Sequence, residues 1–178
     1  MAVSDIEAVE LLDLLDAAGA QPWVAGGWGV DALIERQTRP HRDLDVMVVA
    51  ERLDDALAAL YANGFHVSLD GLPVRVELDD GIRIVVLHPI HADGSGGWWQ
   101  AAPDDGRYRY PAGSVVGGLI GGHTVRCASP SLHLKVRTEC PSSPVDEHDL
   151  AHLHEMLADP DDEGSSPWAG GHGIPGTL

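Results

Sequence analysis

One segment of the chain, residues 25–49 (AGGWGVDALIERQTRPHRDLDVMVV), constrains the fold more than any other. Apolar residues just before Gly26-Gly27 predict a short buried strand, and residues 28–36 predict a helix. The apolar run at 43–49 predicts a second strand. Helices and strands that alternate in this way indicate a domain in which helices cover a sheet.

Periodicity, helix caps and turn residues place the other elements. We expect helices at 5–18, 52–63, 130–135 and 146–157, a hairpin at 73–88 around an Asp80-Gly81 turn, a long loop at 89–107 and a strand at 123–128. Together, these predicted helices and strands indicate an α+β fold with a mixed sheet of four to five strands. We expect one domain over residues 1–158, followed at 159–178 by a flexible acidic tail rich in Gly, Ser and Pro.

The chain is strongly acidic, with 11 Lys+Arg, 28 Asp+Glu and a formal net charge of −17. That charge argues against nucleic acid or an anionic membrane as a partner, and it would attract a cationic ligand. No apolar stretch is long enough to span a membrane, and the first residues are acidic where a signal peptide is basic. Cys127 and Cys140 form no metal motif. These features predict a cytoplasmic protein.

The Gly-Gly pair and the Asp-Leu-Asp motif indicate a phosphate and metal site. Gly26 and Gly27 let a ligand approach the backbone, and the amides of the helix that follows can face phosphate oxygens. Asp43 and Asp45 occupy alternate positions of a predicted strand, so their carboxylates are expected on one face. Mg²⁺ binds one or two carboxylates together with substrate phosphates.

This pattern resembles the DNA polymerase beta-type nucleotidyltransferase superfamily. Residues 25–46 look more closely like the small antibiotic nucleotidyltransferases that act on aminoglycosides and lincosamides. The resemblance covers roughly residues 5–157 and includes later motifs in the expected order: Leu87-His88-Pro89, Trp99-Gln100, Tyr110-Pro111 and Asp146-x-His148-Asp149-Leu150.

The resemblance implies the nucleotidyltransferase fold. It also implies a Mg²⁺-dependent transfer of a nucleoside monophosphate from a nucleoside triphosphate to a hydroxyl of a small cationic antibiotic, with ATP as the expected nucleotide. It implies that Asp43 and Asp45 are catalytic and hold the metal. The nucleotide-binding residues that we expect are Gly26, Gly27, Trp28, Arg39 and Arg42. The assembly is left open between the single chain and a homodimer.

One position departs from the family pattern. The family carries a third carboxylate just before Leu-His-Pro, and Val86 occupies that position here. Valine neither binds a metal ion nor accepts a proton. We expect Glu77, on the paired strand of the hairpin and diagonal to Val86, to replace the carboxylate as third ligand or general base. His88 is a second candidate for the proton transfer.

Two functions therefore stay open. The first is an active antibiotic nucleotidyltransferase. The second is a catalytically degenerate protein that keeps the fold and binds ligands without transferring a nucleotide, and Val86 is the residue that favours it.

Overall fold

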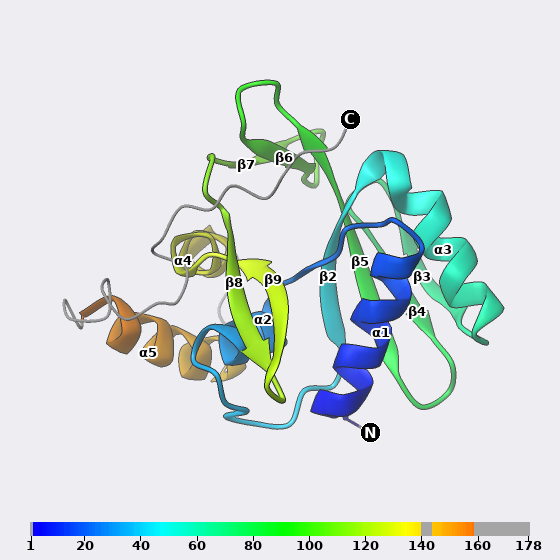
Figure 1. Ribbon diagram of the computed structural model, residues 1–178. Helices are drawn as coiled ribbons and strands as arrows, with labels where there is room; N and C mark the ends of the chain where they lie inside the picture. Colours follow the sequence, from blue (N-terminus) through cyan, green and yellow to red (C-terminus); the bar gives the residue numbers. More distant parts are fainter. Residues whose placement is uncertain (1, 140–143, 159–178) are drawn as a thin grey trace.

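The computed structural model describes residues 2–139 and 144–158, and these form a curved mixed sheet with helices packed on it (Figure 1). Seven strands follow the order β3-β4-β5-β2-β1-β9-β8, and β6 and β7 extend the sheet from β5. Strand β2 runs parallel to β5 and β1 parallel to β9, whereas the other pairs are antiparallel. The bounds are β1 Trp23–Val24, β2 Leu44–Val49, β3 His66–Gly71, β4 Arg75–Asp79, β5 Ile84–Ala92, β6 Trp98–Ala101, β7 Arg107–Tyr110, β8 Val115–Ile120 and β9 His123–Ala128.

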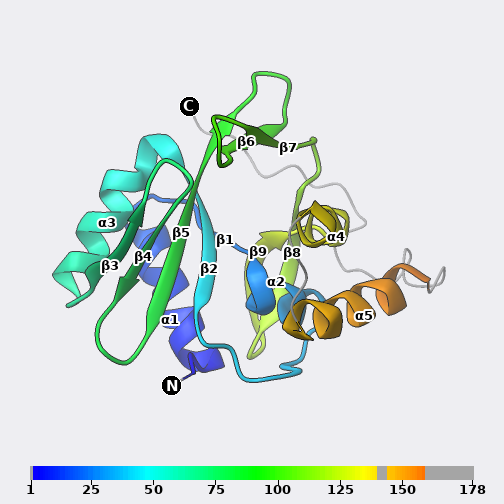
Figure 2. The same cartoon turned by 180° about the vertical axis from the view of Figure 1, so that it is seen from behind.

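The helices form two groups. In Figures 1 and 2, α1 and α3 lie beside β2–β5, whereas α2, α4 and α5 gather near β8 and β9. The bounds are α1 Asp5–Ala17, α2 Gly26–Leu33, α3 Leu53–Ala62, α4 Pro130–Glu139 and α5 Pro144–Ala158, with a 3₁₀ turn at Ala50–Arg52. Among the described residues no helix is long and apolar enough to cross a membrane.

The alternation along β2 divides the core between its two faces. Leu44, Val46 and Val48 point to one face and belong to the larger apolar cluster, which α1 and α3 help to build. Met47 points to the other face and packs in a smaller cluster that includes Leu132. Because Asp45 has the same parity as Met47, its carboxylate emerges on the side of the smaller cluster.

The α+β class is confirmed, but the sheet of the described residues has nine strands rather than four or five. The sequence pattern does not predict β3 or β8. Strand β3 is exposed at the sheet edge, and its two apolar residues, Val67 and Leu69, are too few to mark a buried strand face. The region 89–107 is not one long loop, because β5 continues to Ala92 and a β6–β7 hairpin follows.

The predicted hairpin exists, but its turn and register are different. Asp80 and Arg83 close a four-residue loop in which the Asp80 carboxylate accepts hydrogen bonds from the Ile82 and Arg83 amides at 2.9 and 2.7 Å. Glu77 is therefore paired with Val86, one step closer than the diagonal position that a two-residue turn gives. The predicted tail at 159–178 and Cys140 lie outside the described residues.

Candidate active site

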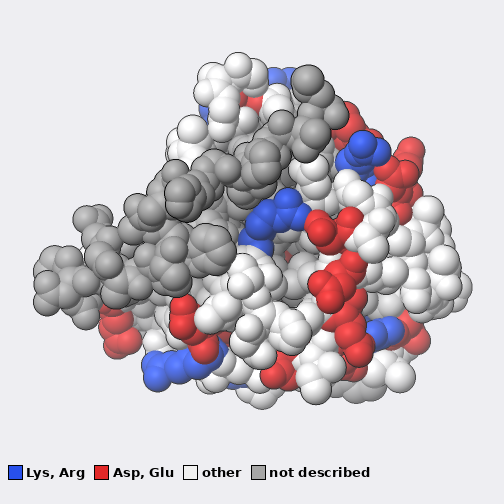
Figure 3. All heavy atoms as spheres, in the orientation of Figure 1, with Lys and Arg blue, Asp and Glu red and all other residues white. Residues whose placement is uncertain are grey.

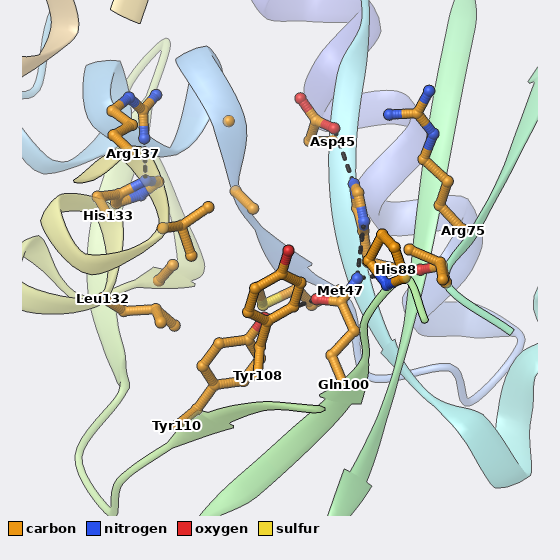
Figure 4. Close-up of a pocket in the computed structure, with 16 residues that line it drawn as sticks. Asp45, Met47, Arg75, His88, Gln100, Tyr108, Tyr110, Leu132, His133 and Arg137 are labelled. Carbon is orange, nitrogen blue, oxygen red and sulfur yellow. Dashed lines mark hydrogen bonds and ion pairs between the residues drawn. The ribbon is translucent and has the colours of Figure 1, made fainter. Parts of the chain in front are cut away.

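A cavity of about 470 Å³ opens between the β2–β5 strands and helix α4. Figure 4 shows Asp45, Met47 and His88 on one side and Leu132, His133 and Arg137 on the other. The lining residues come from six strands, two helices and the segments between them: Ala25, Gly26, Asp45, Met47, Val74, Arg75, His88, Gln100, Pro103, Tyr108, Tyr110, Ala128, Leu132, His133, Val136 and Arg137.

Both glycines at the start of α2 are required by close packing. Gly26 has φ +58°, and a Cβ there would overlap the Oδ2 atom of Asp45. A Cβ on Gly27 would overlap the side chains of Arg39 and His41. The predicted strand–Gly-Gly–helix unit is thus confirmed, and it brings the free amides of the first α2 turn next to Asp45.

The two predicted metal ligands are partly exposed and lie at the start of β2. The side chains of Asp43 and Asp45 are 23 % and 27 % exposed. Arg42 donates two hydrogen bonds to one Asp43 oxygen, at 2.6 and 3.0 Å. Burial opposes ionisation of Asp45, but the hydrogen bond from His88 and the nearby positive charges outweigh it and hold the pKa of Asp45 below its ordinary value.

A chain of hydrogen bonds fixes the proton on His88. Tyr110 donates to the Gln100 carbonyl oxygen at 2.7 Å, and the Gln100 amide nitrogen donates to the Val74 carbonyl at 3.0 Å. The same nitrogen lies 3.2 Å from His88 Nδ1, so Nδ1 is an acceptor. The proton of a neutral ring is then on Nε2, which donates to Asp45 Oδ1 at 2.9 Å. This arrangement makes His88 a support for Asp45 rather than a base.

Three strands place Asp45, Val86 and Glu77 in one row. Asp45 is in register with Val86 on β5, and Val86 is paired with Glu77 on β4. Neighbouring strands are about 4.8 Å apart, so the Cα atoms of Asp45 and Glu77 are separated by roughly 10 Å, with buried Val86 between them. Glu77 lies 3.1 Å from Arg75 in an ion pair. Among the described residues no three His, Cys, Asp or Glu side chains gather around one metal position.

The other predicted nucleotide-binding residues lie around α2 with different partners. The side chain of Trp28 is buried against His41, so only its backbone is available to a nucleotide. Arg42 is occupied by Asp43, and Arg39 pairs with Asp149 on α5. His41 is buried and lies 2.5 Å from Asp31, which ties the connection before β2 to α2.

Residues to which the sequence pattern gave no role form the α4 side of the cavity. Arg137 donates to His133 Nδ1 at 3.0 Å and to Asp149 at 2.7 Å. Burial lowers the pKa of His133 to about 3, so its ring is neutral. Asp149 lies inside α5 and is buried, so it anchors the two arginines from within the helix. In the sequence, the i, i+4 spacing of His133 and Arg137 indicates that the two side chains are neighbours on one face of a helix.

Three further side chains, on α4 and β6, have structural partners. Lys135 donates to the Arg109 carbonyl at 2.7 Å. Trp98 packs edge-on against Trp23. The ring of Trp99 stacks on His91 and also contacts the Arg107 guanidinium.

The donor set at the start of β2 fits Mg²⁺. The two carboxylates offer hard oxygen ligands, and the amides of α2 next to them can hold the phosphates that complete such a site. The overlap that any side chain at Gly26 would make with Asp45 shows that the carboxylate and the helix N-terminus are close enough to share one ligand.

Comparison with known proteins agrees with this geometry. The family described as aminoglycoside-2''-adenylyltransferase matches residues 7–153. The chain belongs to this family. Curated relatives include a lincosamide resistance protein of Staphylococcus haemolyticus, 33 % identical over 60 % of this chain, and a 2''-aminoglycoside nucleotidyltransferase of Klebsiella pneumoniae, 31 % identical over 67 %. The alignments span 66 % and 64 % of those two relatives, so the chain matches about two thirds of their length.

Solved structures share the fold over most of the chain. The lincomycin-bound lincosamide antibiotic adenylyltransferase LnuA has a TM-score of 0.79 and 26 % identity, covering 88 % of this chain and 99 % of LnuA. ANT(2'')-Ia in complex with adenylyl-2''-tobramycin has a TM-score of 0.67 and 22 % identity, covering 86 % and 88 %, which supports the fold alone. The nucleotidyltransferase fold is therefore confirmed.

Proposed function

We propose that this protein transfers a nucleoside monophosphate from a nucleoside triphosphate to a hydroxyl of a small antibiotic-like acceptor. ATP is the nucleotide that we expect as the donor. The observation that carries the proposal is the contact between Gly26 and Asp45, because it joins a phosphate-binding helix N-terminus to a metal-binding carboxylate. Family membership supports the same chemistry. Because the reaction consumes a nucleoside triphosphate, we expect the protein to act in the cytoplasm, where nucleoside triphosphates are made.

Groups that line the cavity and groups beside it have separate tasks in this mechanism. Asp43 and Asp45 would hold Mg²⁺, which when bound neutralises triphosphate charge. The amides of residues 26–28 bind phosphate oxygens, and His88 keeps Asp45 oriented through its Nε2–H. The acceptor hydroxyl oxygen attacks the α-phosphorus while pyrophosphate leaves. Glu77 takes the hydroxyl proton after it turns away from Arg75.

The cavity lining favours an acceptor with a large apolar part and few positive charges. Among the described residues of the lining, Asp45 is the one that is acidic, and the metal would use it. Apolar or aromatic side chains form most of the remaining wall: Ala25, Met47, Val74, Pro103, Tyr108, Tyr110, Ala128, Leu132 and Val136. A polycation would find too few carboxylates here, whatever the net charge of the whole chain. We therefore favour a lincosamide-type acceptor over an aminoglycoside.

Mass spectrometry of the products tests the proposal. The protein is incubated with Mg-ATP or Mg-GTP and either lincomycin or tobramycin. We expect a nucleoside-monophosphate adduct of lincomycin with Mg-ATP, and none after Asp45→Asn. Adducts on tobramycin alone would overturn the acceptor assignment. The absence of any adduct on either acceptor would overturn the proposed activity.

A catalytically degenerate binding protein is the second candidate, and Val86 favours it. This side chain is buried beside Asp45, at the register position where a third carboxylate would complete the site. Calorimetry and the product assay together separate the two candidates. A degenerate member would bind Mg-ATP and lincomycin in the calorimeter and still form no product.

A further inference from the structure

We propose that Asp149 on α5 is a positioning residue that holds Arg39 and Arg137 together near the N-terminus of α2, to bind the phosphates of the nucleotide. The inference rests on the proposed function only in its choice of ligand. Its observations are the contacts of one buried carboxylate with two guanidinium groups.

Asp149 is bonded to both arginines at the same time. Arg39 binds it in a two-point contact, with Nε 3.1 Å from Oδ1 and Nη2 2.9 Å from Oδ2. Arg137 Nη2 donates to Oδ2 at 2.7 Å. Asp149 is 1 % exposed, so it is a fixed internal anchor and not a ligand for an incoming cation. Planar guanidinium groups held by a carboxylate in this way keep one orientation.

The two guanidinium groups lie near the first turn of α2. A Cβ on Gly27 would overlap Arg39 Nη2, which places that group against the backbone of the helix start. Arg137 lines the cavity together with Gly26 and Asp45, and Figure 4 shows it across the cavity from Asp45. An anion at the N-terminus of α2 would therefore meet both the helix amides and the positive charge of this pair.

The contacts of His133 also hold Arg137 in place. His133 is 3 % exposed and lines the cavity, and its Nδ1 accepts a hydrogen bond from Arg137. Its Nε2 has no hydrogen-bond partner among the described residues. This nitrogen is shut off from solvent and lies against Gly29 of α2, so the hydrogen bond between His133 and Arg137 fixes the guanidinium group where α4 packs on α2.

The charges favour this arrangement only with Asp149 in place. Two guanidinium groups that lie close together repel each other, and one buried carboxylate compensates the repulsion and leaves one net positive charge. Without Asp149, Arg39 and Arg137 would turn apart toward solvent. The expected defect is then a loss of affinity for phosphate groups rather than for the acceptor.

Isothermal titration calorimetry on the full chain tests this expectation. Mg-ATP, inorganic triphosphate and lincomycin are titrated separately into wild type, Asp149→Asn, Asp149→Glu and the matched control Glu155→Gln. Glu155 lies on the same helix, is exposed and is 3.4 Å from His152, away from both arginines. We expect Asp149→Asn to weaken ATP and triphosphate binding at least about tenfold and to leave lincomycin binding within about twofold of wild type. Asp149→Glu should recover part of the loss, and Glu155→Gln should match wild type.

If Asp149→Asn does not fold, Arg39→Lys gives the same information, because lysine keeps the charge and loses the two-point contact. Triphosphate affinity within about twofold of wild type in a folded variant would overturn the inference, as would an equal loss of lincomycin affinity. A wild type that binds ATP and transfers nothing would overturn the proposed activity alone. A wild type that binds neither ATP nor triphosphate would overturn both.

Discussion

Glu77 lies directly opposite Val86 across the antiparallel pair of β4 and β5. Since Val86 is also in register with Asp45, the carboxylate of Glu77 can approach the metal ligands only over a buried valine. This relationship raises the question of whether the chain has lost its base or moved it to the next strand.

Glu77→Gln answers that question directly. If Glu77 accepts the hydroxyl proton, the amide variant should lower kcat by roughly 10²-fold at an unchanged KM for ATP. Product formation is measured under steady-state conditions with Mg-ATP and lincomycin. The control Glu10→Gln removes an equal charge from an exposed position on α1 and should have no effect. Unchanged turnover in the Glu77→Gln variant would exclude Glu77 from the proton transfer.

Val86→Asp should raise the transfer rate by at least about tenfold. The new carboxylate would stand one strand spacing, about 4.8 Å, from the backbone of Asp45 and could act as ligand or base. Val86→Asn is the matched control, because it has the same shape without the charge. A rate for the Val86→Asp variant no higher than that of Val86→Asn would mean that the missing carboxylate does not limit the reaction.

Gly26→Ala should abolish nucleotide transfer, since the added methyl group overlaps the Asp45 carboxylate. Gly64→Ala is the matched control. Gly64 also has a positive φ, +86°, so alanine there carries a similar backbone cost of about 1 kcal/mol, but its Cβ would meet nothing within 4 Å. Thermal unfolding and activity are measured on both. Equal activity in the two variants would contradict the role assigned to the Gly26–Asp45 contact.

Acid should destabilise the protein in part through His133. Burial lowers its pKa to about 3 in the folded protein, whereas the unfolded chain takes up this proton near 6.5. The contribution of His133 to folding stability is therefore intact above about pH 6.5 and falls, by up to about 1.4 kcal/mol per pH unit, as the pH drops toward 3.

Urea unfolding between about pH 7 and pH 4 measures this slope. His133→Gln should flatten it, because glutamine takes up no proton in either state. His123→Gln, at an exposed position on β9, should keep the wild-type slope. An equally steep loss of stability in both variants would show that other groups govern the acid response.

The acidity of the chain is spread over its surface rather than concentrated in the cavity. On the face shown in Figure 3, acidic side chains form a band beside a few basic ones. Away from the cavity, Arg126 on β9 pairs with Asp16 on α1, and both line a separate groove of about 620 Å³. The net charge of −17 is therefore weak support for a cationic acceptor, because it reports little about the walls of the cavity.

The sequence by itself determined the features that depend on neighbouring residues. The strand–Gly-Gly–helix unit, the position of Asp43 and Asp45 at the start of a strand and the strand at 123–128 all follow from spacing over a few residues. Local spacing is enough because strand parity and helix caps are set by the backbone near them.

Only the tertiary structure decided what depends on distant partners. The pairing of Glu77 with Val86 came from a four-residue turn where the sequence suggested two, and a shift in register moves every opposed pair. Asp149 reaches Arg39 across 110 positions of sequence, and His88 receives its tautomer from Gln100 on another strand. Such contacts are selected by burial, since a buried charge or polar atom must find a partner wherever the folded chain supplies one.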